Sequence, residues 1–304
     1  MTGAREVAEV NEVHEVNKSR GVAAFFDLDG TLLALPSLER RLFRTLRYRK
    51  AIPVKSYFLW PLEALRLMPR GISAMLQANK MYLRGVQILH GCGERDGDVS
   101  SWHKDGHQAE GQASAPPRRD PRWPVPTFFA EAIERVAWHA RQGHEIVLVS
   151  GTLDPLVRGA ARALEAELAA CGIAVTIRVF ATRLEESDGM WTGRILGEAM
   201  FGEAKAHAAK GFAKDMGFDL ERCYAYGDSL NDRALMESVG WPVAVNPSND
   251  LASIARKQCW PVVYWNQEKD ATPRLHRPRS SERRKNSRGR LQRDVPIASG
   301  VRRD

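Results

Sequence analysis

Three apolar runs along the chain each end abruptly in polar or small residues, and this pattern predicts three buried strands. The runs cover residues 22–26, 145–149 and 224–227, and the residues of interest that follow them are Asp27, Asp29, Thr31, Ser150, Gly151, Asp228 and Asp232. A carboxylate at the end of a buried strand is costly unless it is paired, hydrogen-bonded or bound to a metal. Ligands of open α/β sheets bind beyond the carboxyl ends of the strands, so we expect a site at this edge.

The remaining periodicity predicts alternating helices and strands, which is typical of a doubly wound α/β domain. A further helix is expected to begin near Gly202 and to carry Lys205, and a short one to follow Asp228. The other expected elements are helices over 128–141 and 154–170, strands over 175–180, 242–245 and 261–265, and a hairpin that turns at Asp188 and Gly189.

Residues 36–90 interrupt this alternation with apolar residues at intervals of three and four, which predicts short helices divided by Pro53, Pro61 and Pro69. The segment holds 11 Lys/Arg and 2 Asp/Glu. Its first helix is basic and is followed by aromatic residues; these residues are Arg40, Arg41, Arg44, Arg47, Arg49, Lys50, Tyr57, Phe58 and Trp60. The pattern is typical of helices that lie on an anionic membrane surface, and a solvated basic face above an ordinary core is the alternative.

Three segments lack the periodicity of a packed core. We expect residues 1–20 to be a disordered extension without the apolar core of a signal peptide, 91–126 to be a flexible inserted loop, and 266–304 to be a basic disordered tail. The tail holds 12 Lys/Arg of a chain whose net charge is +8, but without interleaved aromatic residues it predicts no specific nucleic-acid binding. Zinc is a lesser alternative for the loop, through His90, Cys92, His103 and His107.

The four cysteines lie far apart, which predicts a reducing compartment and no disulfide framework. These residues are Cys92, Cys171, Cys223 and Cys259. We therefore expect a cytoplasmic protein, with peripheral contact to the inner face of the membrane if the basic segment binds lipid.

The polar residues occur in an order that resembles the four motifs of the haloacid dehalogenase superfamily of phosphotransferases. These motifs are Asp27-Leu28-Asp29-Gly30-Thr31, Ser150-Gly151-Thr152, Gly202-Glu203-Ala204-Lys205 and Gly227-Asp228-Ser229-Leu230-Asn231-Asp232. Three further segments, 181–185, 192–194 and 243–247, resemble the subfamily IB hydrolases. That subfamily includes phosphoserine phosphatases, some histidinol-phosphate phosphatases and lipid phosphatases.

The resemblance implies a role for each residue. Asp27 would attack the phosphorus to form an aspartyl-phosphate, and Asp29 would act as general acid and then as general base. Lys205 would balance negative charge, although Lys210 is a competing candidate one and a half turns later. The expected substrate-binding residues are Thr31, Ser150 and Gly151, and the expected Mg²⁺ ligands are Asp27, Asp29 through its carbonyl, Asp228 and Asp232.

The resemblance also implies a catalytic core over 21–35 and 127–265 and a helical cap over 36–90. Phosphoserine phosphatases carry a cap glutamate shortly after the nucleophile that binds the substrate amine, whereas here Leu35-Pro36-Ser37 stands in that region and Glu39 is the first acid. The expected substrate is a small phosphorylated metabolite or a lipid phosphate headgroup. A phosphate- or lipid-binding protein without turnover is the alternative, and the complete set of catalytic residue types argues against it.

Overall fold

The computed structural model describes residues 21–70, 79–88 and 124–265. The expectations for 1–20, for 266–304 and for most of the loop over 91–126 lie outside these residues. The zinc candidates His90, Cys92, His103 and His107 lie outside them too.

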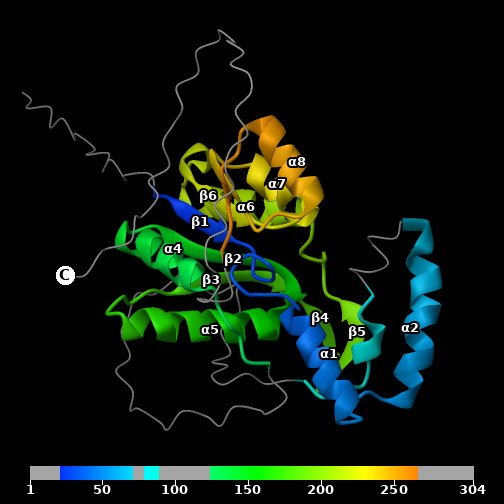
Figure 1. The fold of residues 1–304 in the computed structure, drawn as a ribbon. Coiled ribbons are helices and arrows are strands. Elements are labelled where there is room, and N and C mark those ends of the chain that lie inside the picture. The colour runs from blue at the N-terminus through cyan, green and yellow to red at the C-terminus, as the bar shows by residue number, and fades with distance from the viewer. Residues whose placement is uncertain (1–20, 71–78, 89–123, 266–304) are drawn as a thin grey trace, which may run out of the picture. The chain divides into compact units, whose positions relative to one another are not determined.

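A six-stranded parallel sheet forms the centre of the fold, with strand order β3-β2-β1-β6-β7-β8 (Figure 1). Its strands are β1 (Ala23–Phe26), β2 (Glu145–Leu153), β3 (Ile177–Thr182), β6 (Tyr224–Gly227), β7 (Trp241–Val245) and β8 (Val262–Val263). The chain adds β2 and β3 on one side of β1 and then β6, β7 and β8 on the other. The order therefore reverses between β1 and β6, which is where doubly wound sheets form their ligand sites.

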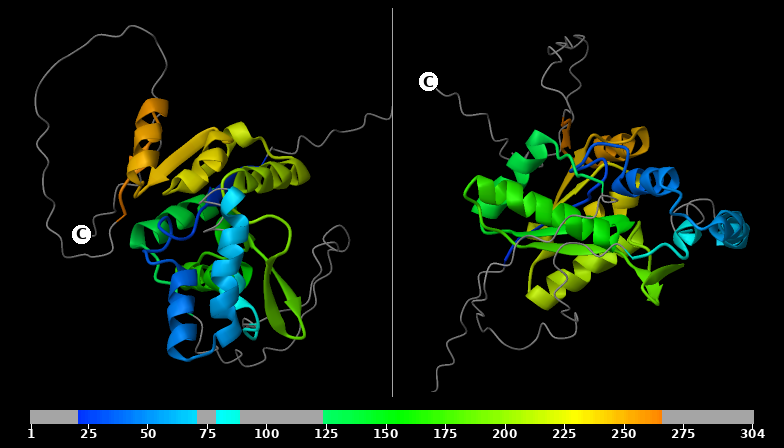
Figure 2. Two further views of the ribbon diagram at one scale, coloured as in Figure 1. Left: turned by 90° about the vertical axis from the view of Figure 1, so that its right-hand side faces the viewer. Right: turned by 90° about the horizontal axis from the view of Figure 1, so that it is seen from below.

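Helices cover both faces of the sheet (Figures 1 and 2). They are α4 (Ala130–Arg141), α5 (Asp154–Ala170), α6 (Glu203–Met216), α7 (Arg233–Glu237) and α8 (Asn249–Gln258), with the short turns η4 (Leu220–Arg222) and η5 (Leu230–Asp232). Successive residues of β1 point to opposite faces, so Phe26 packs with α4 and α5 while Phe25 packs with α6, α7 and α8. Both faces of β1 are therefore buried, as its unbroken apolar run predicts.

The segment between β1 and β2 carries two helices that lie side by side (Figure 2), with Phe43 of the first against Trp60 of the second. Its elements are α1 (Leu38–Tyr48), α2 (Val54–Leu67), η1 (Met68–Arg70) and η2 (Met81–Leu83), and the antiparallel hairpin of β4 (Leu184–Ser187) and β5 (Met190–Ile195) pairs with residues 85–88. We refer to α1, α2, η1 and η2 as the helical insert.

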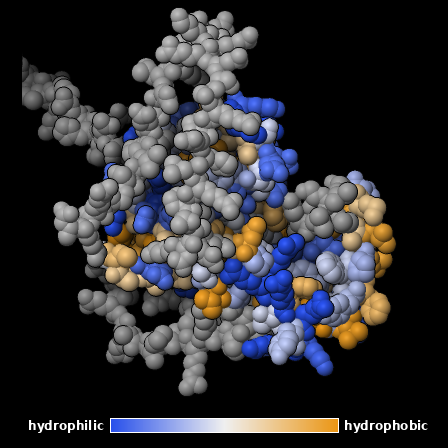
Figure 3. Space-filling model, in the orientation of Figure 1, coloured by the Kyte–Doolittle hydropathy of each residue, from blue (hydrophilic) through white to orange (hydrophobic). Residues whose placement is uncertain are grey.

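The two helices of the insert differ in what they expose. Leu38, Leu42 and Leu46 bury one face of α1 at intervals of four residues. On α2, by contrast, a row of apolar side chains is exposed (Figure 3); its members are Val54, Phe58, Leu62 and Leu65. Among the residues that the structure describes, no helix is long and apolar enough to cross a membrane.

A single guanidinium group joins the insert to the two chain segments that connect it to the sheet domain. Arg41 of α1 donates to the carbonyl oxygens of Pro36 (2.8 Å) and Ala34 (2.7 Å), on the segment that enters the insert. It also donates to the carbonyl of Val125 (3.2 Å), on the segment that leads back to the sheet. The basic residue at this position is therefore structural rather than one more solvated cation of α1.

Several element boundaries differ from the sequence expectations, while the helix over 154–170, the lysine-bearing helix and the hairpin turn are confirmed. Pro61 does not divide a helix but lies inside α2, where it is exposed, so water can bond the carbonyl that loses its intrahelical partner. The helix expected from 128 begins at Ala130 because Phe128 bridges to Leu33.

Two strands are displaced or shorter than expected. The strand expected over 175–180 is Ile177–Thr182, since pairing with β2 begins at Ile146 opposite Ile177. The strand expected over 261–265 is limited to Val262–Val263, because the amide of Trp265 donates to the Asn246 side chain (2.9 Å) instead of extending the backbone pairing with β7.

Candidate active site

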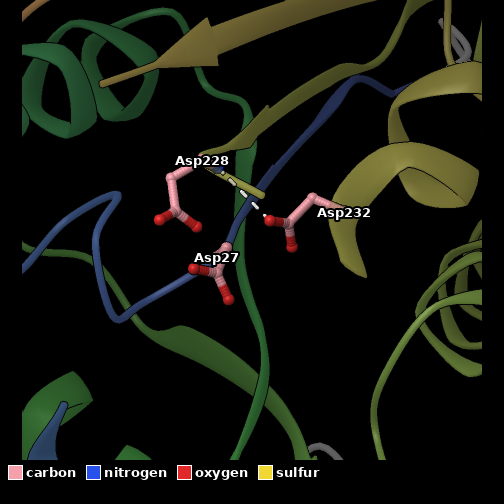
Figure 4. Close-up of side chains that lie close together, drawn as sticks. All are labelled: Asp27, Asp228 and Asp232. Carbon is pink, nitrogen blue, oxygen red and sulfur yellow. Dashed lines mark hydrogen bonds between the residues drawn. The ribbon is translucent and has the colours of Figure 1, made fainter. Parts of the chain in front are cut away.

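Three carboxylates meet where β1 and β6 end side by side (Figure 4). Asp27 follows β1, Asp228 follows β6, and Asp232 ends the turn η5; one oxygen from each lies within 4.8 Å of the others. The backbone amide of Asp27 donates to the carbonyl of Tyr226 (2.9 Å), which continues the strand pairing up to this position. Asp27 and Asp232 are buried, so the cluster lies inside the fold rather than on its surface.

Lys205 supplies the positive charge that this cluster needs. Its ammonium lies 2.6 Å from Asp27 Oδ1 and 2.6 Å from Asp232 Oδ1, and its side chain is 2% exposed. Burial alone would lower the pKa of Lys205, but the carboxylates of Asp232 and Asp27 outweigh burial and raise it. Lys210, the competing candidate, is exposed further along α6. The structure therefore places Lys205, and not Lys210, among the carboxylates.

Asp232 uses both carboxylate oxygens within the protein. Besides the ion pair through Oδ1, its Oδ2 accepts from the backbone amides of Asp228 (3.2 Å) and Ser229 (3.1 Å) and from the Ser229 hydroxyl (2.9 Å). Gly227 allows this approach, since a Cβ there would lie 2.3 Å from Asp232 Cβ. These contacts favour a role in fixing the loop that presents Asp228.

Gly30 lets the loop after β1 pass close to Asp228. Its φ of +99° is in the region that favours glycine, and a Cβ at this position would lie 2.2 Å from Asp228 Oδ2. Any other residue would therefore require the Asp228 side chain or the loop itself to shift.

Asp29 is held by two donors from different parts of the fold. Its Oδ1 accepts from the backbone amide of Leu38 (2.8 Å), the first residue of α1, and its Oδ2 accepts from the Thr152 hydroxyl (2.6 Å). Burial raises the pKa of Asp29, and these two hydrogen bonds oppose the shift. A carboxyl group with a raised pKa is suited to carry a proton at one stage of a reaction and release it at another.

Thr152 is a site residue to which the sequence pattern assigned no role. Strand β2 continues beyond Ser150 to Leu153, with a shift of its register against β3 after Ser150. A second hydroxyl two residues after Ser150 is the signal that would have identified Thr152.

The expected substrate-binding residues lie at the same end of the sheet. Phe26 pairs with Leu148, so Ser150 and Gly151 stand just beyond the level at which β1 ends. Among the described residues, the buried Thr31 hydroxyl has no hydrogen-bond partner. An unpaired buried hydroxyl is costly, and an oxyanion ligand would satisfy it.

The carboxylates of the cluster outnumber its ammonium groups among the described residues. Burial raises the pKa of Asp27 to about 7, although Lys205 opposes the shift. Burial, together with the neighbouring Asp27 and Asp232, raises the pKa of Asp228 to about 8. Three carboxylates thus share one ammonium, and a divalent cation that prefers carboxylate oxygen would balance them.

Comparison with known proteins identifies the family to which this chain is similar. Residues 24–237 match the family model described as haloacid dehalogenase-like hydrolase. The chain is 35% identical over 154 residues to a probable phosphatase of Mycobacterium tuberculosis, which is 51% of this chain and 50% of that protein. It is 36% identical over 129 residues to a protein of that organism named phosphoserine phosphatase, which is 42% of this chain and 39% of that protein. The chain thus spans about half the length of the curated relatives it matches.

A solved structure is similar over most of the chain. It is described as a protein with unknown function from Bordetella pertussis Tohama I, and it is 27% identical to this chain. The match covers 80% of this chain and 98% of that one, with a TM-score of 0.51.

Proposed function

Because this chain belongs to the haloacid dehalogenase-like hydrolase family, we propose that it is a Mg²⁺-dependent phosphomonoester hydrolase that acts through Asp27. The observation that carries the proposal is the position of Asp27 beside a buried ammonium and a second strand-end carboxylate, with a carboxyl group of raised pKa two residues later. These groups belong to Lys205, Asp228 and Asp29. Positioning and charge balance of this kind are what phosphoryl transfer requires.

In the first displacement, Asp27 attacks the phosphorus and forms an acyl phosphate while the bond to the leaving oxygen breaks. Lys205 binds Oδ1 of Asp27, which leaves Oδ2 for the attack. Asp29 donates its proton to the leaving alcohol. The hydroxyls of Thr31 and Ser150 and the amide of Gly151 are the proposed donors to the phosphoryl oxygens.

In the second displacement, Asp29 takes a proton from water, and the resulting hydroxide attacks the phosphorus. Orthophosphate leaves and the carboxylate of Asp27 is restored. Asp27, the carbonyl of Asp29 and Asp228 would hold Mg²⁺, which neutralises the repulsion between carboxylate and phosphate when bound.

A phosphate-release assay tests this proposal. We expect the full chain to release phosphate from p-nitrophenyl phosphate and from at least one of phosphoserine, histidinol phosphate and a lysophospholipid phosphate, with Mg²⁺ present. EDTA should remove the activity, and Asp228→Ala should lower it at least about 100-fold because the cation loses an anionic ligand. The exposed Asp250→Ala is the matched control. Full activity in EDTA would contradict the metal requirement, and phosphate binding without any turnover would favour the non-catalytic alternative.

The surface of the helical insert favours a more specific candidate, a lipid phosphate headgroup reached from a membrane surface. Arg40, Arg44 and Arg47 are exposed along one row of α1. The exposed apolar row of α2 lies on the neighbouring helix (Figure 3). Cationic and apolar side chains on adjacent helices suit an anionic bilayer, where each basic residue contributes about 1 kcal/mol.

Binding to vesicles tests this candidate. We expect the full chain to bind vesicles with anionic lipid at low salt, and to bind at least about tenfold more weakly when Arg40, Arg44 and Arg47 are changed to Gln. The control changes Lys210, Lys214 and Lys257 to Gln, which removes the same charge from the exposed surface of α6 and α8. Equal weakening of both variants would indicate that net positive charge attracts the chain to the vesicle wherever that charge lies. This result would remove the support for a lipid substrate.

A further inference from the structure

One carboxylate of the helical insert lies beside the proposed general acid. Glu39 is the second residue of α1, next to Leu38, whose backbone amide binds Asp29. The negative charge of Glu39 is one of the influences that raise the pKa of Asp29. Residues 36–90 contain two acids in all, and the other, Glu63, pairs with Arg66 on α2. Glu39 is therefore the acid of the insert that directly follows the residue bound to Asp29.

Glu39 is already bound to an ammonium of the protein itself. The Lys80 ammonium lies 2.6 Å from Oε1 and 2.7 Å from Oε2, and the Tyr82 hydroxyl donates to Oε1. The Lys80 side chain is 5% exposed and that of Glu39 is 16% exposed. Both oxygens of Glu39 are thus occupied, and the pair is largely removed from water.

Lys80 is held firmly by its surroundings. Its carbonyl accepts from the amide of Leu83, and the adjacent Asn79 side chain donates to the carbonyl of Trp60 on α2 (2.8 Å). The rings of Phe43, Trp60 and Tyr82 pack against one another, with centroids 5.1 to 6.1 Å apart. A substrate ammonium that displaced Lys80 from Glu39 would therefore leave a buried cation without a partner.

We propose that the Lys80–Glu39 pair determines the specificity of the site by occupying the carboxylate that would otherwise bind an ammonium on the leaving group. This proposal rests on the phosphomonoesterase function proposed above. The favoured substrates are phosphomonoesters whose leaving group carries no ammonium near the ester oxygen, and amino-alcohol esters such as phosphoserine are disfavoured.

Two esters that differ in one group test the proposal. O-Phosphoethanolamine and n-propyl phosphate have leaving groups of similar size, and only the first carries an ammonium. For the full chain we expect kcat/KM to be at least about tenfold higher for n-propyl phosphate. Lys80→Met keeps the bulk of the side chain and removes the ammonium from Glu39, so we expect the ratio to shift at least about tenfold toward O-phosphoethanolamine.

Two further variants separate specificity from a structural effect. In Lys80→Met/Glu39→Gln the shift should disappear, because the carboxylate that binds the substrate ammonium is gone. Glu39→Gln alone keeps an acceptor for Lys80 and should leave the ratio within about threefold of the unmodified chain. If Lys80→Met does not fold, Glu39→Gln still tests the proposal, because a selective loss of O-phosphoethanolamine turnover beyond about threefold would show that Glu39 already binds the substrate ammonium and would overturn it.

The outcomes distinguish this proposal from the function on which it rests. If the unmodified chain cleaves none of the esters, p-nitrophenyl phosphate included, the proposed function fails. If it cleaves O-phosphoethanolamine as well as n-propyl phosphate, or if a folded Lys80→Met leaves the ratio unchanged, the specificity proposal alone is overturned.

Discussion

The Asp27→Asn protein will release phosphate at least about 10³-fold more slowly than the unmodified chain, with little change in its thermal unfolding. An amide is a poor nucleophile, so the acyl phosphate does not form. The amide oxygen still accepts a hydrogen bond from Lys205, which keeps the loop in place. Initial rates with p-nitrophenyl phosphate and Mg²⁺, together with the unfolding temperature, measure the two effects.

Asp215→Asn is the matched control for this variant. Asp215 is exposed on α6, so this substitution removes the same charge at a position away from the cluster. Beryllium fluoride, a mimic of an acyl phosphate, should raise the unfolding temperature of the unmodified chain and not that of Asp27→Asn. Turnover by Asp27→Asn within tenfold of the unmodified chain would exclude Asp27 as the nucleophile.

The Lys205→Met protein will lose about 3–5 kcal/mol of unfolding free energy at pH 8 in EDTA. The variant leaves Asp27 and Asp232 buried without the ammonium that lies 2.6 Å from each. Denaturant unfolding measures the loss. Lys210→Met changes an exposed lysine of the same helix and should cost less than about 0.5 kcal/mol.

A second substitution shows whether the loss arises from charge. Asp27→Asn in the Lys205→Met background removes one of the two uncompensated carboxylates and should recover part of the lost stability. If Lys205→Met and Lys210→Met lose equal stability, or if Asp27→Asn brings no recovery, the ammonium does not hold the cluster together.

The strand ends of this site could be predicted from sequence because the apolar runs are unambiguous. A run buried on both faces ends at a definite residue, so Asp27 and Asp228 could be placed at the same edge of a parallel sheet. The position of Lys205 followed from its motif rather than from periodicity, since nothing in the pattern of α6 distinguishes it from Lys210.

The contacts between distant segments could not be predicted, because each depends on how separate elements pack. Thr152 reaches Asp29 only because β2 continues past Ser150, and Lys80 reaches Glu39 only because the chain returns beside α1. Pro61 is the opposite case. The general rule that proline breaks helices predicts an end of the helix at this residue, but the exposed face of α2 tolerates the missing backbone hydrogen bond.

The placement of β1 at the centre of the sheet affects how the site forms during synthesis. Asp27 meets its ammonium 178 residues later in the chain, and Asp29 meets its hydroxyl donor 123 residues later. Closing loops of this length is slow, because their entropy is lost before the contacts form. A nascent chain therefore carries its proposed nucleophile long before it carries the partners that activate it. Under the proposed mechanism, turnover therefore requires a chain that extends through η5, which carries Asp232.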